Sequence, residues 1–196
     1  MLVRTLLAAS LALASVSAYA AAETYTIDST HTQAEFTWNH FGFSNPSGNF
    51  DKIEGTITFD AANPSQSSVN VTIAIDSINA HVEKLDTHLK SADFFDAEKF
   101  PVATFKSTRV EKVEGEGKFK VTGDLSLHGV TKSVVLDAKL NRVDEHPMKK
   151  VPTIGFDAST TLKRSDFGLG YAVPNVSDEI RIRITTEASV PKKVAG

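Results

Sequence analysis

Histidines are the side chains of this chain best suited to metal binding or acid–base chemistry, and the chain has six of them. His81 and His88 are seven residues apart in a stretch with helical spacing, so one helix face could present both to a zinc ion. The histidine pair four residues apart with an adjacent glutamate, which metalloproteases use, is missing. We therefore expect surface or hydrogen-bonding histidines and no metal site.

Nucleophiles and paired carboxylates give no stronger signal. Cysteine is absent, and no Gly-x-Ser-x-Gly segment raises a serine above a sheet. Asp93 and Asp96 could share acid–base work if buried, but their setting after a predicted helix is typical of capping and turns. The triplet Asp166-Phe167-Gly168 matches the magnesium triplet of kinases by letters alone, without the other kinase motifs. We expect no enzyme activity and no cofactor.

Two segments, 88–96 and 164–168, combine charged and aromatic side chains near the ends of predicted elements. One interpretation is a polar mouth above an apolar cavity. The other is an ion pair, Arg164 with Asp166 or Asp93, that fixes a loop, and such structural pairs are the more common feature. From the residues alone both interpretations stay open.

Residues 1–20 have the pattern of a secretory signal peptide. Arg4 supplies a positive charge, 5–16 is an apolar run, and Ala18-Tyr19-Ala20 offers small residues for cleavage. The run is about a dozen residues long, whereas a helix needs roughly 20 to span a bilayer. We predict cleavage after residue 20, or as late as residue 22, and export of the rest. A retained membrane anchor is the alternative.

The remaining residues, 21–196, suit a single domain with a sizeable core. The chain carries 21 Lys and Arg against 24 Asp and Glu, a formal net charge of −3. That balance argues against a nucleic-acid partner, which would need a concentrated basic surface. Because an exported chain without cysteine has no disulfides, its core alone must hold the fold.

Alternation of apolar and polar residues dominates this part of the chain. It occurs in 34–40, 53–59, 69–75, 119–127, 134–140, 154–162 and 180–188, with a shorter candidate at 103–107. Successive side chains of a strand point to opposite faces, so each segment predicts a strand with one apolar face. About eight such strands must pack on a second sheet or close on themselves. The residues alone do not choose between a sandwich and a barrel.

One segment, 77–95, has helical spacing instead. Its apolar residues recur three and four positions apart, which predicts a short amphipathic helix with Asn79 as N-cap and Pro101 as a stop to any continuation. A helix inserted between the strands of a barrel often covers an open end. The segment His128-Gly129-Val130-Thr131 predicts a tight hairpin between two well-patterned strands.

Several of these segments together resemble the YceI-like family. The resemblance is carried by 25–31, 36–40, 48–50, 55–57, 88–96, 99–101, 105–108, 123–132, 164–168 and 176–180. It implies an all-β fold, an extended eight-stranded antiparallel lipocalin-like barrel with a short helix covering one end. It also implies a tunnel for a long apolar lipid, a polyisoprenoid such as an isoprenoid quinone or a prenyl phosphate, and a periplasmic location in a Gram-negative bacterium. A homodimer and transient membrane contact for lipid exchange are further expectations.

Strand parity and the family motifs together predict the residues that contact the lipid. They are Phe36, Trp38, His40, Phe59, Leu89, Phe94, Phe95, Phe105, Phe156, Arg164 and Phe167. Small inward residues, which we take to be Gly55, Gly123, Ala138 and Ala158, would leave space in the lumen. Two alternatives remain: an enzyme acting on an isoprenoid lipid through His31, His40 and Arg164, and a filled barrel that binds a partner protein on its surface.

Overall fold

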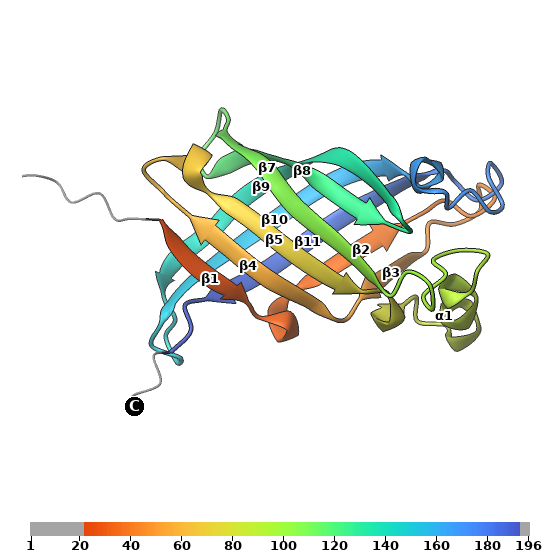
Figure 1. The fold of residues 1–196 in the computed structure, drawn as a ribbon, viewed down its shortest axis with the longest axis horizontal. Coiled ribbons are helices and arrows are strands. Elements are labelled where there is room, and N and C mark those ends of the chain that lie inside the picture. The colour runs from red at the N-terminus through yellow and green to blue at the C-terminus, as the bar shows by residue number, and fades with distance from the viewer. Residues whose placement is uncertain (1–21, 193–196) are drawn as a thin grey trace, which may run out of the picture.

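Antiparallel strands make up most of the computed structural model, which describes residues 22–192 (Figure 1). They are β1 (Glu23–Ile27), β2 (Gln33–Thr37), β3 (Ser47–Phe50), β4 (Ile53–Phe59), β5 (Ser68–Ala74), β6 (Ile78–Asn79), β7 (Val102–Lys112), β8 (Lys118–Leu127), β9 (Val130–Glu145), β10 (Pro152–Lys163) and β11 (Glu179–Ser189). Helix α1 spans Glu83–Lys90, and short 3-10 turns are η1 (Ser29–His31), η2 (Pro64–Gln66), η3 (Ile75–Ser77) and η4 (Arg164–Phe167). The signal peptide predicted for 1–20 lies outside the described residues, so cleavage and location stay predictions.

The sheet closes into a barrel. Its strands pair in the order β1-β4-β5-β7-β8-β9-β10-β11, and β11 returns to pair with β1. Strand β11 also pairs with β2, β2 with β3, and β3 with β6. The pairs β1/β2, β4/β3 and β5/β6 are thus each one barrel strand interrupted by a bend, which reduces eleven segments to eight strands. The predicted eight-stranded antiparallel barrel is confirmed, and the sandwich is excluded.

Local turn chemistry sets the register of the longest strands. His128 and Gly129 form the two-residue loop between β8 and β9, with φ of 51° and 75°. Both loop positions in a turn of this kind need positive φ, and glycine adopts it at no steric cost. Leu127 therefore pairs directly with Val130, and the pairing continues to Lys118 opposite Lys139. The predicted hairpin is confirmed.

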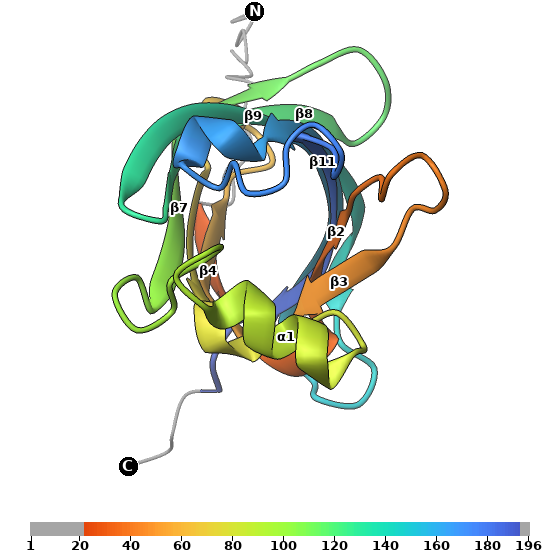
Figure 2. The ribbon, with the colours of Figure 1, turned by 90° about the vertical axis from the view of Figure 1, so that its right-hand side faces the viewer.

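The helix begins later than its spacing predicts. Val82, not Asn79, is the N-cap of α1, and Asn79 lies in the short strand β6. The Asn79 side-chain oxygen accepts a hydrogen bond from the His81 backbone N–H at 2.9 Å, which turns the chain before the helix starts. The Asp86 carboxylate accepts one from the Ala80 N–H at 2.5 Å. The helix lies at one end of the barrel, as expected (Figure 2).

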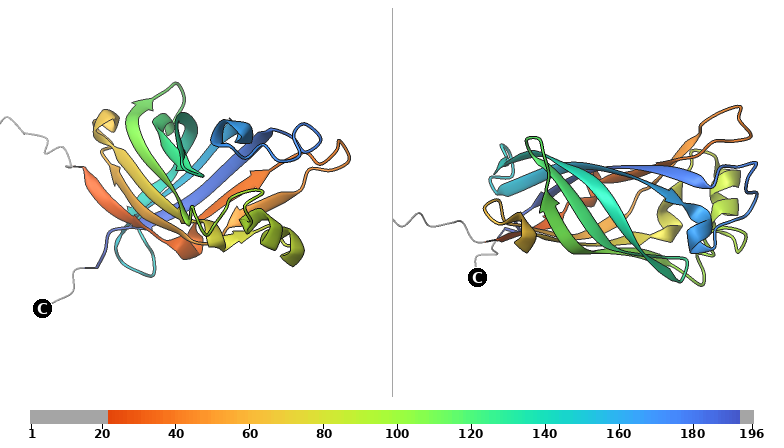
Figure 3. Two further views of the ribbon diagram at one scale, coloured as in Figure 1. Left: turned by 45° about the vertical axis from the view of Figure 1, so that its right-hand side comes forward. Right: turned by 90° about the horizontal axis from the view of Figure 1, so that it is seen from above.

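The two ends of the barrel carry different connections. At the α1 end lie the loops 38–46, 80–101 and 168–178, whereas the turns 60–67, 113–117 and 146–151 lie at the other (Figures 1 and 3). Within the described residues, no helix is both long enough and apolar enough to cross a bilayer.

Candidate functional site

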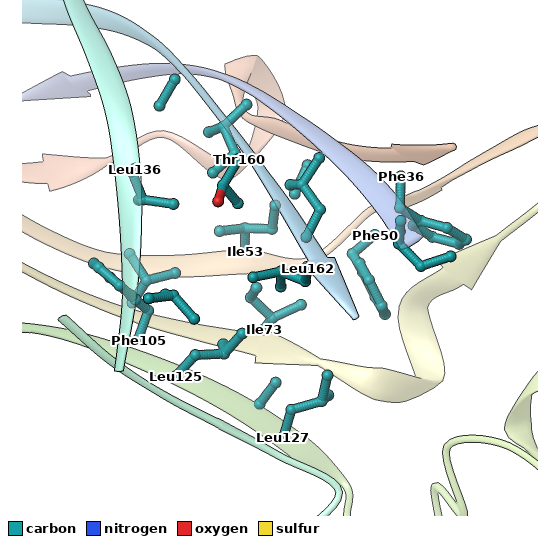
Figure 4. Close-up of a pocket in the computed structure, with 18 of the residues that line it drawn as sticks. Phe36, Phe50, Ile53, Ile73, Phe105, Leu125, Leu127, Leu136, Thr160 and Leu162 are labelled. Atoms are coloured by element: carbon teal, nitrogen blue, oxygen red, sulfur yellow. The ribbon is translucent and has the colours of Figure 1, made fainter. Parts of the chain in front are cut away.

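The barrel encloses a cavity of about 820 Å³. Such a volume falls in the range of ligand sites, about 300–1,000 Å³. The inward residues of every barrel strand contribute to its wall, and Figure 4 shows side chains from opposite walls pointing into the same space. Within residues 22–192, Arg164 is the only wall residue with a permanent charge. The wall is therefore suited to an apolar guest.

Burial along the strands shows where the barrel is hollow. On β11 the inward residues Ile180, Ile182 and Ile184 are only half-buried, although they point to the barrel axis and line the cavity. Further along, Ile154 and Ala188 are 0% exposed because side chains pack directly against them. Tightly packed interiors leave few voids larger than a water molecule. The half-buried isoleucines thus border space that a ligand can fill.

Aromatic rings close the cavity at the end opposite α1. Phe59 and Phe119 are 5.9 Å apart between ring centroids, and Phe156 lies 5.7 Å from Phe59 and 6.3 Å from Phe119. All three pairs meet edge to face, the arrangement that aromatic quadrupoles favour. We call these residues the aromatic floor. A chain entering from the α1 end would stop there.

A second aromatic cluster holds α1 against the barrel. The Phe36 ring stacks on Trp38 at 5.8 Å and lies 5.4 Å from Phe50, which meets Phe95 at 5.8 Å. Leu89 is the buried residue of the helix and packs into the same cluster. The helix is thus anchored by apolar contacts to β2 and β3, and it forms one side of the cavity mouth.

Two small residues expected to leave lumen space do not. A Cβ at Gly123 would lie 2.5 Å from the Phe105 ring, so that ring already occupies the space. A Cβ at Gly55 would lie 2.1 Å from the Asn70 carbonyl oxygen, so this glycine permits a close approach of β5 to β4. The prediction was wrong for both glycines. The alternation of a strand shows which face a residue lies on, but it does not show which neighbouring side chain or backbone fills the space beside it. Ala138 and Ala158, which pair directly between β9 and β10, do line the cavity.

Arg164 is buried, and backbone carbonyl groups hold it. Its Nε donates to the Ser177 oxygen at 2.9 Å, one Nη to the Val176 oxygen at 3.0 Å, and the other Nη to the Leu169 oxygen. Desolvation by burial lowers the pKa of the guanidinium, and Asp178 partly opposes this. The ion pair predicted with Asp166 or Asp93 is wrong, since Arg164 takes part in no ion pair among the described residues.

The histidines do not converge. His31 lies outside the cavity, 3.1 Å from an Asp28 oxygen that also accepts a hydrogen bond from Lys149 at 2.6 Å. Hydrogen bonds from Lys149 and Thr30 hold the pKa of Asp28 well below its ordinary value. Within residues 22–192, no three His, Asp or Glu side chains lie close enough together to hold a metal ion.

The mouth is bridged by aromatic contacts between α1 and the loop 168–178. The His88 ring lies 5.0 Å from Phe94 and 5.6 Å from Tyr171, and Phe94 lies 5.2 Å from Tyr171. His88 Nε2 is also 3.2 Å from an Asp93 carboxylate oxygen. These side chains narrow the entrance from two sides.

All eleven residues predicted to contact a lipid lie on the cavity wall, and contact with a ligand stays a prediction for each. The cavity wall also includes residues that were not predicted to contact the lipid, among them Phe50, Leu125, Leu136, Thr160 and Tyr171. Strand parity could have supplied the first four, because each belongs to an alternating segment or a family motif. Thr160 places a hydroxyl oxygen in the middle of the wall (Figure 4). Tyr171 lies in a loop without periodicity, so no sequence signal pointed to it.

Together the fold and the cavity define a lipocalin-like antiparallel barrel, hollow, apolar inside and closed at one end. The YceI-like domain family matches residues 25–188, and the chain belongs to this family. A UPF0312 protein of Photorhabdus laumondii is 41% identical over 190 residues, which cover 95% of this chain and 97% of the relative. The resemblance seen in the sequence is thus confirmed.

Solved structures share the architecture. BcnA of Burkholderia cenocepacia matches with a TM-score of 0.75 and 25% identity, over 83% of this chain and 99% of that one. A polyisoprenoid binding domain from Saccharophagus degradans matches with a TM-score of 0.65 over 85% of this chain and 98% of that one. Its identity is 16%, so this likeness is one of fold.

Proposed function

We propose that the chain binds one long apolar lipid, a polyisoprenoid such as an isoprenoid quinone or a prenyl phosphate, inside the barrel and performs no chemistry on it. The observation that carries the proposal is the 820 Å³ apolar cavity bordered by half-buried strand residues. The shared fold with a polyisoprenoid binding domain supports the same class of ligand.

The wall suggests how the lipid lies. The aromatic floor closes one end, whereas Arg164, His40, His88 and Tyr171 line the cavity at the α1 end. The tail therefore points to the floor, and the polar end of the lipid lies near the mouth. A buried guanidinium whose partners are carbonyl groups favours an oxygen-rich end group that can accept a further hydrogen bond.

Burial of the tail can provide the affinity. Burying a methylene contributes about 0.8 kcal/mol, so about twenty apolar carbons give a gross gain of about 16 kcal/mol. Association and ordering cost about 4–15 kcal/mol of that gain. A site with one or two orienting polar groups is therefore sufficient. The alternative of a barrel filled by its own side chains is disfavoured, because such a barrel would not contain this cavity.

The N-terminal pattern of 1–20 supports export, and we place the protein in the periplasm as part of the proposal. The test is native mass spectrometry of protein purified from the periplasm of its own cells, followed by organic extraction and identification of the released molecule. We expect one isoprenoid per chain. A chain that is empty, and that also fails to take up added octaprenyl benzoquinone, would overturn the proposal.

The enzyme alternative has a separate check. Incubation of the loaded protein for hours should return the same lipid by mass spectrometry. A lipid converted to a product in a time-dependent way, by the chain and not by a heat-denatured sample, would replace the carrier proposal with an enzyme.

A further inference from the structure

Exposed apolar side chains gather at the mouth of the cavity. Of the nine large apolar side chains exposed among the described residues, five lie there: Phe41, Phe43, Val82, Tyr171 and Val173. Phe43 is 92% exposed. Single exposed apolar residues are ordinary on a protein surface, but a group of them around one opening marks an interaction site.

The turn that carries Phe41 and Phe43 is held rigid. The Asn39 side chain accepts a hydrogen bond from the Gly42 N–H at 2.8 Å, and the His40 carbonyl accepts one from the Phe43 N–H at 3.0 Å. Phe41 has a φ of +53°, which a bulky side chain rarely adopts. Because such strain costs free energy and persists only where surrounding contacts impose it, the fold fixes the backbone of this turn at Phe41.

Two mouth loops form one unit without formal charge. The Phe41 N–H donates to the Asn175 oxygen at 2.9 Å, and the Ser177 N–H donates to the Asn39 oxygen at 2.9 Å. The loops 38–46 and 168–177 contain no Asp, Glu, Lys or Arg, in a chain of which 23% is charged. We call them the uncharged rim. The third connection at this end, 80–101, does carry charged residues, among them Glu83, Lys84 and Lys90, so the uncharged rim consists of these two loops alone.

The chemistry of the uncharged rim suits one partner. Aromatic side chains concentrate at the boundary between lipid headgroups and acyl chains, and charged side chains are costly deeper, in the hydrocarbon core. The two loops are joined near Asn39 and Asn175, and their tips project beyond the barrel end in different directions (Figure 3). A stable dimer, in contrast, uses a continuous face of about 800 Å² on each partner. A bilayer accepts projecting tips without such a face.

We propose that the uncharged rim docks the α1 end of the barrel on a lipid bilayer, with Phe41 and Phe43 inserted among the lipids. The cavity mouth then opens toward the membrane, so that an apolar ligand passes between bilayer and barrel without crossing water. The evidence for docking comes from the uncharged rim alone. The ligand transfer step rests on the proposed function as well.

Docking is tested on delipidated protein, so it does not depend on a bound ligand. Because the chain has no cysteine, Asn175→Cys takes a single environment-sensitive fluorophore beside the Phe41 turn. Phosphatidylcholine vesicles should shift its emission to the blue, and the same label on Met148→Cys, which is 83% exposed at the other end, should not respond. Adding Phe43→Ser to the Asn175→Cys chain should weaken vesicle partitioning about tenfold.

Three outcomes would overturn the docking proposal: no response of the Asn175 label to vesicles, equal responses of the labels at Asn175 and Met148, or equal partitioning with and without Phe43→Ser. A delipidated chain that sediments as a dimer, becomes a monomer with Phe43→Ser and ignores vesicles would assign the rim to a contact between copies.

Transfer is tested with protein loaded with octaprenyl benzoquinone. Its transfer rate to vesicles should rise in proportion to vesicle concentration, and Phe43→Ser should slow it about tenfold while leaving the bound amount unchanged. Met148→Ser is the matched control. A rate independent of vesicle concentration contradicts transfer by docking. Failure of the chain to take up the quinone contradicts the proposed function and leaves the fluorescence result in place.

Discussion

At the scale of single residues, Arg164 performs a structural task that its charge alone did not suggest. It lies at the end of β10 and donates hydrogen bonds to three backbone carbonyl groups of the segment 169–177. The planar fork of a guanidinium can reach several acceptors at once, which a single ammonium group cannot do. The residue thus shapes the mouth while its side chain borders the cavity.

Replacing Arg164 should therefore loosen the loop. We expect Arg164→Gln to lower the free energy of unfolding by about 2–3 kcal/mol, because buried carbonyl groups lose their donors. Chemical denaturation measures this change, and hydrogen exchange should show faster amide exchange in 169–177. Arg181→Gln, on the exposed face of β11, is the control and should change stability by less than about 0.5 kcal/mol. Equal effects of the two substitutions would contradict the structural role.

Asp28 supplies a pH dependence with a definite sign. Its pKa is held below the ordinary value by Lys149 and Thr30, so the ionised form stabilises the fold. This stabilisation is complete above the unfolded-state pKa, about 3.9, and is lost as the pH falls through the lower folded-state pKa. Asp28→Asn should cost about 1 kcal/mol at pH 7, a small value because the Lys149 side chain is 39% exposed and screened by water.

Denaturation of both proteins from pH 7 to pH 2 checks this expectation. The gap between wild type and Asp28→Asn should be constant above about pH 4 and narrow steadily as the pH falls below it. A gap that stays constant across this range would show that Asp28 acts through its shape and hydrogen bonds to neutral groups instead of through its charge.

At the scale of elements, alternation of apolar residues was enough to place most strands. The patterns in 154–162 and 180–188 lie inside β10 and β11. Alternation predicts a strand regardless of its neighbours, because it reflects only that successive side chains point to opposite faces. The helix start was missed, since Asn79 is a good N-cap by type but is used in β6. The partners of Arg164 were missed because they lie in a loop that only the tertiary fold brings back to it.

The aromatic contact between α1 and the loop 168–178 should control ligand passage. Tyr171→Ala removes the ring that meets His88 and Phe94 across the mouth. An aromatic pair contributes about 0.5–1.5 kcal/mol, so uptake and release of octaprenyl benzoquinone should both accelerate about three- to tenfold. Stopped-flow fluorescence of the single Trp38 in the wall follows the exchange. Val135→Ala, on the exposed face of β9, is the control, and unchanged rates in Tyr171→Ala would contradict a gate here.

At the scale of the whole molecule, the two ends of the barrel differ. The aromatic floor fixes its depth, and the mouth carries Arg164, His40, His88 and the uncharged rim. Under the proposed function, a tunnel closed at one end should select lipids by length. Each added isoprene unit should strengthen binding until the tail reaches the floor, and further units should stay outside. Neither the depth nor the floor could be predicted from the sequence, because both depend on how Phe59, Phe119 and Phe156 meet across strands that are far apart along the chain.

Raising the floor should therefore shorten the preferred lipid. Ala158 lines the cavity two residues from Phe156, so Ala158→Phe fills the space just above the floor. Affinities measured for prenyl quinones of increasing length should level off at a shorter chain than in wild type, with a loss for long chains of about 0.8 kcal/mol for each methylene expelled. Ser159→Phe puts the same ring on the exposed face of β10 and should keep the wild-type length dependence. If both variants follow the wild-type curve while remaining folded, the lipid does not reach this part of the barrel and the proposed placement of its tail is wrong.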